Sequence, residues 1–110
     1  MVINPISPMF YVELQIGPGI VNALLDSGAS DNSISDRVAR ELRLKRHQLH
    51  EGQTFTAASG NTIPCTEFVH VYVTIHTIRF YMNLRVAPMH HDLILGIPFL
   101  QRFNPLINWQ

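Results

Sequence analysis

The alternation of apolar with polar or aromatic residues in the second half of the sequence constrains the fold most strongly. In the run Val69–His76, the apolar residues Val71, Val73 and Ile75 occupy every second position. A similar β-rich run follows at Ile78–Val86. Because the side chains of a strand alternate between its two faces, this pattern predicts a sheet with one buried face.

The other segments of the chain are mostly short, rich in β-branched and aromatic residues, and separated by turn formers, which is typical of an all-β domain. A hairpin is predicted over residues 54–63, with Ser59-Gly60-Asn61 as its turn. Further strands are predicted at residues 10–16, 20–25, 93–95 and 106–109.

One or two short helices interrupt this all-β pattern. Apolar residues recur at helical spacing over Asp36–Leu44, and Ser35 is placed to cap this helix at its N-terminus. Residues 97–103 form a second candidate helix. The basic residues within 43–46 are expected to complement the dipole at the end of the first helix.

The composition restricts the size, location and partners of the protein. At 110 residues the chain is predicted to form a single domain, 1–110. Its eight basic residues balance its eight acidic ones, so no positive field favours nucleic acid as a partner. Cys65 is the single cysteine, which rules out an intramolecular disulfide and suits a reducing interior. Because no apolar run is long enough to span a membrane, we expect a soluble, cytoplasmic protein without membrane contact.

Metal binding and serine chemistry have weak support in the sequence. Six histidines are present, but neither His47 with His50 nor His90 with His91 has an acidic or thiol partner at a suitable spacing. No metal or other cofactor is therefore expected. Ser27 lacks the Gly-x-Ser-x-Gly elbow that a serine nucleophile commonly occupies.

Asp26 is the strongest candidate for a catalytic residue. By itself Asp26-Ser27-Gly28 predicts only a turn, because all three residue types favour turns. The apolar run Ala23-Leu24-Leu25 precedes it, however, and carries the carboxylate to the edge of a buried strand. An unpaired charge is costly there, so a compensating group is required.

Two motifs together resemble the retropepsin family of aspartic proteases. The first is Leu24-Leu25-Asp26-Ser27-Gly28-Ala29, and the second is Leu93-Ile94-Leu95-Gly96, which precedes a short helix. A closer similarity, to the proteases of gypsy-type long-terminal-repeat retrotransposons, extends over nearly the whole chain. It includes Leu25–Ser30, Ile34-Ser35, Ile94–Leu100 and Asn104–Trp109.

The resemblance implies a closed, barrel-like β-fold with a flap hairpin, and an aspartic endopeptidase that cleaves a retroelement Gag-Pol polyprotein. Hydrolysis without a metal needs one group to take a proton from water and another to donate one to the carbonyl oxygen. Two neighbouring carboxylates that share one proton do both. The sequence contains a single Asp-Ser-Gly, so a homodimer with one Asp26 from each subunit is predicted. We expect the enzyme in the cytoplasm, including retroelement particles.

The resemblance also assigns roles to the residues around Asp26. Ser27 would bond across the dimer, Gly28 would let the backbone approach the substrate, and Ala29 would pack beside the carboxylates. Further substrate-binding residues are expected in the same loop, in the flap and in apolar pockets: Ser30, Asp31, Ala57, Ala58, Ser59, Gly60, Leu24, Ile94 and Ile97.

Ile97 departs from the retroviral pattern, in which a charged residue at this position helps to hold the dimer together. Gypsy-type sequences share this departure. The alternative function is a domesticated retropepsin-like module that dimerises or binds peptides with weak or no catalysis, because a fold alone does not establish function. We also expect the chain to be a domain excised from a longer polyprotein.

Overall fold

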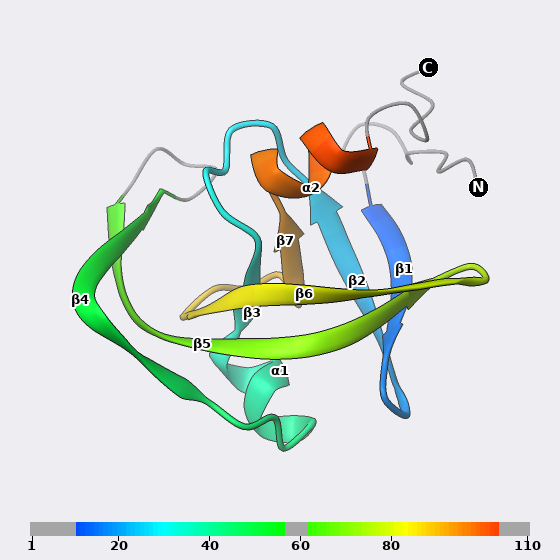
Figure 1. Cartoon of the computed structure of the whole chain (residues 1–110), viewed down its shortest axis with the longest axis horizontal. Helices are drawn as coiled ribbons and strands as arrows, with labels where there is room; N and C mark the ends of the chain where they lie inside the picture. The colour runs from blue at the N-terminus through cyan, green and yellow to red at the C-terminus, as the bar shows by residue number, and fades with distance from the viewer. Residues whose placement is uncertain (1–10, 57–61, 104–110) are drawn as a thin grey trace.

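The computed structural model describes the backbone of residues 11–56 and 62–103, and the side chains of residues 11–48 and 66–102. This part of the chain contains seven strands and two short helices (Figure 1). Neither of the described helices is long and apolar enough to cross a membrane. The predicted turn at 59–61 and the predicted strand at 106–109 lie outside the described residues. In chain order the elements are β1 (Tyr11–Ile16), β2 (Gly19–Leu25), β3 (Ser33–Ser35), α1 (Asp36–Glu41), β4 (His47–Thr56), β5 (Thr62–Ile75), β6 (Ile78–Ala87), β7 (Leu93–Leu95) and α2 (Ile97–Phe103).

Six of the described strands close into a barrel. Their order is β1-β2-β7-β3-β6-β5, and β5 returns to β1 by pairing Thr74 with Gln15 and Val73 with Ile16. β4 lies outside this ring and pairs with β5. The pairs β2–β7 and β3–β6 are parallel, whereas the other neighbours are antiparallel. The predicted all-β, barrel-like fold with short helices is therefore confirmed.

Alternate residues of the long strands fill the barrel, as their sequence pattern predicts. In β5, Val71, Val73 and Ile75 are buried, while Tyr72 between them is 53% exposed. Helix α2 adds Phe99, which is 1% exposed and contributes to the same core cluster. Burial of an apolar side chain of this size contributes roughly 1.5–3 kcal/mol, which holds α2 against the barrel.

The two motifs singled out in the sequence lie side by side in the structure. β2 and β7 pair in parallel, with Leu25 beside Leu95 (Figure 1). Both side chains are buried, as expected for parallel strands covered on both faces. Because parallel strands end at the same edge of a sheet, Asp26 and Gly96 leave the barrel next to each other.

Helix α1 begins where the sequence predicts but ends before Leu44. The N–H of Val38 donates to Oγ of Ser35 at 2.9 Å, which confirms the predicted cap. The helix is shorter than predicted because Arg43 adopts a left-handed φ of 54°. The N–H of Leu44 then donates to the carbonyl of Ala39 at 3.0 Å, and this bond closes the final turn.

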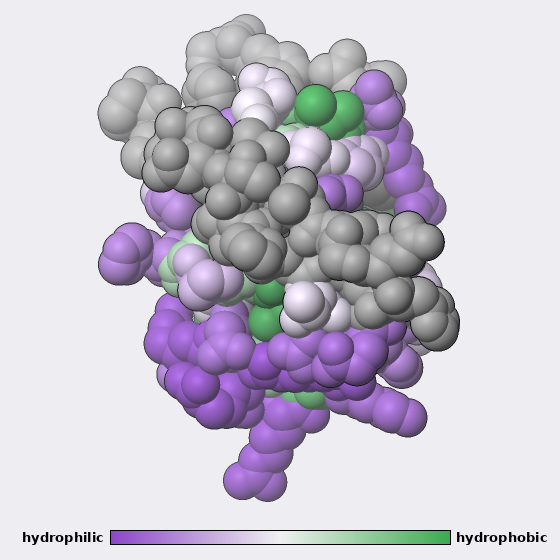
Figure 2. Space-filling model, turned by 90° about the vertical axis from the view of Figure 1, so that its left-hand side faces the viewer, coloured by the Kyte–Doolittle hydropathy of each residue, from purple (hydrophilic) through white to green (hydrophobic). Residues whose placement is uncertain are grey.

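The expected placement of Arg46 at the end of α1 is wrong. Its Nη1 donates to Oδ1 of Asp36 at 2.6 Å, in the first turn of the helix, and lies 3.3 Å from Oε1 of Glu67 in β5. The chain reverses after Arg43 and returns along α1, so Arg46 and β4 start beside the opposite end of the helix. β4 is accordingly much longer than the strand predicted within residues 54–63. The lower part of Figure 2, where α1 lies, is largely hydrophilic.

The contact between Arg46 and Asp36 makes a testable contribution to stability. The hydrogen bond from Arg46 lowers the pKa of Asp36 below its ordinary value of 3.8, so folding favours the charged carboxylate. We therefore expect Asp36→Asn to lower the melting temperature near neutral pH. The difference from wild type should shrink as the pH falls below 3.8 and wild-type Asp36 takes up its proton.

Glu13→Gln is the matched control, because Glu13 is exposed and forms no ion pair with a described residue. Its melting temperature should follow that of wild type over the same pH range. A deficit in Asp36→Asn that stays constant down to about pH 2 would contradict an effect of carboxylate charge.

Candidate active site

β2 carries Asp26 to the edge of the barrel, where the chain leaves the sheet. The N–H of Asp26 donates to the carbonyl of Leu95 at 3.0 Å, which extends the β2–β7 ladder by one bond beyond the strand. Residues 26–32 then form the loop that leads to β3 (Figure 1). The backbone position of Asp26 is therefore fixed by the sheet itself.

The two oxygens of the Asp26 carboxylate have different surroundings. Oδ1 accepts a hydrogen bond from the N–H of Gly28 at 2.8 Å. Oδ2 is buried and has no hydrogen-bond partner among the described residues. An unsatisfied buried polar atom costs about 1–3 kcal/mol, and more when it is charged. Oδ2 is therefore placed to receive a proton or a hydrogen bond from a group outside the described residues.

Gly96 allows the loop after Asp26 to pack tightly against the end of β7. Its N–H donates to Oδ1 of Asn32 at 2.9 Å, and the N–H of Ile97 donates to the carbonyl of Ala29 at 2.9 Å. A Cβ at Gly96 would lie 2.5 Å from the carbonyl oxygen of Ala29 and 2.6 Å from that of Asp31. Glycine is required here because the loop backbone occupies the space of a side chain.

The predicted loop residues differ in their exposure. Ser27, Gly28 and Ser30 are exposed, and Asp31 is half-buried. Ile97, at the start of α2, is 39% exposed although it is apolar. The four predicted flap residues, 57–60, lie outside the described residues. The roles of all these residues in substrate binding stay predictions.

The predicted pocket residues Leu24 and Ile94 belong to a small apolar cluster that is separate from the main core. Tyr11 packs against this cluster, and its OH lies 3.4 Å from Nδ1 of His91. Two members of the cluster flank Asp26 in the sequence: Leu24 lies two positions before it and Ala29 three positions after it. Its buried members are Leu24, Ala29, Ala87 and Ile94.

Asp92 connects the loop before β7 to three other elements. Its Oδ1 accepts a hydrogen bond from Nη2 of Arg37 in α1 at 2.7 Å, and its Oδ2 accepts one from the N–H of Asn22 in β2 at 3.2 Å. Its carbonyl accepts one from the N–H of Ser35 at 2.9 Å. The contact with Asp92 raises the pKa of Arg37 above its ordinary value. These partners are far apart in the sequence, so no local pattern predicts them.

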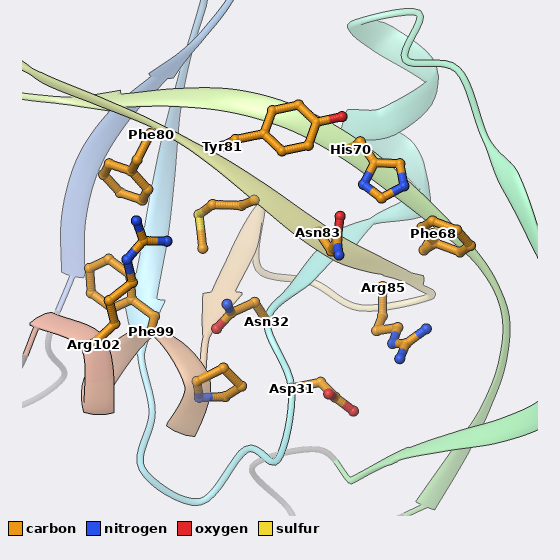
Figure 3. A pocket seen from close by; sticks show the side chains of 12 residues that line it. Asp31, Asn32, Phe68, His70, Phe80, Tyr81, Asn83, Arg85, Phe99 and Arg102 are labelled. Atoms are coloured by element: carbon orange, nitrogen blue, oxygen red, sulfur yellow. The ribbon is translucent and has the colours of Figure 1, made fainter.

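A groove of about 500 Å³ lies beside the loop that carries Asp26 (Figure 3). Asp31 and Asn32 line one side of it, while β6 and α2 contribute most of the remainder. Asp31 is the one predicted substrate-binding residue with a described side chain that lines this groove. Within the described part of the chain, no group of three or more His, Cys, Asp or Glu residues is placed to hold a metal ion.

We expect Gly96→Ala to destabilise the protein by about 3 kcal/mol, because the added methyl group meets backbone oxygens of Ala29 and Asp31. Urea unfolding followed by circular dichroism measures this change. Gly17→Asn is the control: a Cβ there meets nothing within 4 Å, and asparagine tolerates the φ of 56°. Equal stability of Gly96→Ala and wild type would show that the loop can move away from β7.

Arg37→Ala is expected to loosen the loop before β7. Amide hydrogen exchange of Ser35 and Asn22, whose N–H groups bond to Asp92, should become about fivefold faster, since exposed ion pairs contribute up to about 1 kcal/mol. The matched control is Arg40→Ala, because Arg40 lies on the same helix and pairs with Asp36. Equal acceleration in both variants would indicate general loosening of α1 instead.

The solved structures that are similar to this chain include two proteases or protease-like domains of retroviral type. EIAV protease, in complex with the inhibitor HBY-793, is 19% identical with a TM-score of 0.71, and the match covers 90% of this chain and 91% of that one. The retroviral protease-like domain of Ddi1 from Leishmania major is 21% identical with a TM-score of 0.59, over 87% of this chain and 76% of that one. These similarities confirm the predicted retropepsin-like fold.

Sequence comparison identifies the family. A search of curated proteins found no match. The family model of the PEG10/RTL1 protease domain matches residues 22–110, which is most of the chain. The closer similarity to gypsy-type proteases stays a prediction, but the chain belongs to the PEG10/RTL1 protease domain family.

Proposed function

We propose that the chain is one subunit of a homodimeric aspartic endopeptidase, in which Asp26 from each of two copies forms the catalytic pair. Its family and fold support a function of the aspartic-protease type or a domesticated derivative of it. The observation that carries the finer proposal is the buried Oδ2 of Asp26, which has no described partner. A second carboxylate at this oxygen would share a proton with it and satisfy both groups.

In the proposed reaction, one carboxylate of the pair is ionised and the other is protonated. The ionised carboxylate takes a proton from water, whose oxygen attacks the carbonyl carbon of the scissile peptide. The protonated carboxylate donates its proton to the carbonyl oxygen, which gives a tetrahedral diol. The first carboxylate, now protonated, donates its proton to the leaving nitrogen as the C–N bond breaks, and a hydroxyl of the diol returns its proton to the second carboxylate, which restores the pair. The bond from Gly28 to Oδ1 holds each carboxylate in orientation.

A second copy of the chain is the source that we propose for the second carboxylate. Asp92 bonds to Arg37, Asp31 lines the groove beside β6 and α2, and neither is a hydrogen-bond partner of the Asp26 carboxylate. A two-fold axis near Asp26 would bring an equivalent carboxylate with equivalent surroundings. The exposed apolar side chain of Ile97, next to Gly96, offers contact area for such an interface.

The proposed substrate is a retroelement Gag-Pol polyprotein, cut in extended segments with apolar residues beside the scissile bond. The apolar cluster of Leu24, Ala29, Ala87 and Ile94 around Asp26 supports this preference. The proposed location is the cytoplasm, including retroelement particles, which agrees with the single cysteine of the sequence.

The alternative is a domesticated module that dimerises or binds peptides with weak or no catalysis. The charged contact of retroviral relatives is absent at Ile97, so the dimer would depend on apolar contacts there. A weak dimer would leave two copies of Asp26 apart at low protein concentration. Intact Asp26-Ser27-Gly28 favours the enzyme.

Asp26→Asn should retain the fold and abolish cleavage of the polyprotein junctions that flank the domain. Asparagine keeps the size of the side chain but cannot exchange a proton between water and the scissile peptide. Cleavage is measured by mass spectrometry of the products, and the fold by circular dichroism. Equal cleavage by the variant and wild type would reject the assignment of Asp26.

Mixed dimers test whether the site is shared between two chains. When equal amounts of wild type and Asp26→Asn exchange subunits freely, about one quarter of the dimers carry two intact carboxylates. Activity should therefore fall to about one quarter of that of the same total amount of wild type. If each chain held a complete site of its own, about half of the sites would stay intact and activity would fall only to about one half. That result would contradict the shared site.

A further inference from the structure

One edge of β6 is free over most of its length in the described part of the chain. β6 pairs with β5 from Ile78 to Arg85, but β3 joins its other side only at Arg85–Ala87. The N–H of Arg85 donates to the carbonyl of Asn32 at 2.9 Å, so this residue directs its backbone groups away from β5. Alternate residues of an antiparallel pair point their N–H and C=O the same way. Tyr81 and Asn83 therefore present theirs at the open edge, where no described residue bonds them.

The groove described above, hereafter the β6 groove, follows this edge (Figure 3). β6 forms one wall with residues 80–83 and Arg85, and α2 faces it with Pro98, Phe99 and Arg102. Its volume of about 500 Å³ lies within the range of protein ligand sites. The groove therefore combines unpaired strand backbone with room for a segment of chain.

The two faces of β6 give the groove an alternating chemistry. Phe80 and Met82 point toward the barrel interior, and with Phe99 they supply apolar surface. Asn83 and Arg85 lie on the opposite face of the strand and supply polar groups. An added strand would alternate its own side chains with the same period, so that apolar residues meet the first set and polar residues the second.

The polar part of the groove is suited to an acidic residue. Arg85 and Asp31 point into the same end of the groove (Figure 3), yet they form no ion pair with each other. The guanidinium of Arg85 has no ion-pair partner in the described chain, so it is available to a carboxylate of a bound segment.

We propose that the β6 groove is a second peptide-binding site, which takes an extended segment of the substrate polypeptide as an added strand with alternating apolar and acidic residues. Main-chain hydrogen bonds to Tyr81 and Asn83 bind its backbone, and Arg85 binds an acidic side chain. The site deepens the proposed function, since its occupant is a part of the substrate outside the scissile region. Continuity with the active-site loop supports this occupant: Asp31 and Asn32 line the groove and belong to the loop that begins at Asp26.

Nuclear magnetic resonance with ¹⁵N-labelled Asp26→Asn tests binding without cleavage. The probe is a synthetic peptide of alternating valine and glutamate, and its matched control has glutamine in place of glutamate. We expect the glutamate peptide to shift the amide signals of Tyr81 and Asn83, and the glutamine peptide to bind about tenfold more weakly. N-methylation of the amides on one side of the extended peptide removes the N–H donors on that side. A peptide that would use this side to pair with β6 should therefore no longer bind.

Arg85→Gln in the same background should remove the preference for glutamate. Arg79→Gln is the matched control, because Arg79 lies on the same strand and face but stacks on Tyr72, with its guanidinium carbon 4.1 Å from the ring centroid, outside the β6 groove. Unchanged preference in Arg85→Gln, or unchanged binding of every N-methylated peptide, overturns the proposal. Shifts of Tyr81 and Asn83 produced by raising the protein concentration alone would assign the edge to a second copy of the chain.

A kinetic measurement separates this site from the proposed function. Extension of a cleavable peptide by the valine–glutamate segment should lower KM about tenfold without changing kcat, and Arg85→Gln should abolish that gain. Cleavage without any gain from the extension contradicts the β6 groove as a substrate site. Absence of all cleavage contradicts the proposed function, and the binding experiment then decides on the groove alone.

Discussion

The parallel ladder between β2 and β7 is the constraint on which the candidate site depends. Its last bond, from the N–H of Asp26 to the carbonyl of Leu95, fixes where the chain leaves the barrel. At the matching end of β7, Gly96 lets the loop backbone fill the space of a side chain. Two motifs far apart in the sequence thus become one rigid unit. Buried apolar strands, more than polar neighbours, determine the position of the carboxylate.

Features that rest on local patterns are predictable from the sequence, and those that rest on distant contacts are not. Alternation predicts β5 and β6, and Ser35 predicts the start of α1, because strand faces and helix caps depend on fixed spacing. The end of α1 and the length of β4 follow from the positive φ of Arg43. Arginine has no preference for this conformation, so the sequence does not predict it. Asn32 and Asp92 reach their partners across the fold, so their roles emerge only in three dimensions.

The loop from Asp26 to Asn32 links two kinds of surface. At one end, a carboxylate emerges beside a small apolar cluster that is separate from the main core. At the other end, Asp31 and Asn32 border the β6 groove, with its strand backbone and positive charge. Under the proposed function, the first surface selects residues beside the scissile bond and the second selects residues farther along the substrate. Selectivity would then depend on two weak contacts joined in one chain.

The unpartnered Oδ2 of Asp26 affects the concentration at which the proposed dimer forms, and so the conditions under which it would be active. In a single copy, this atom is a buried acceptor that lowers stability. In the proposed dimer, Oδ2 shares a proton with the Asp26 carboxylate of the second copy. Part of the free energy of association would then come from the same atom that takes part in the proposed reaction. A polyprotein that carries this domain would stay uncut while dilute and be processed once many copies gather. Crowding of the precursor would set the timing of its maturation, without a separate activator.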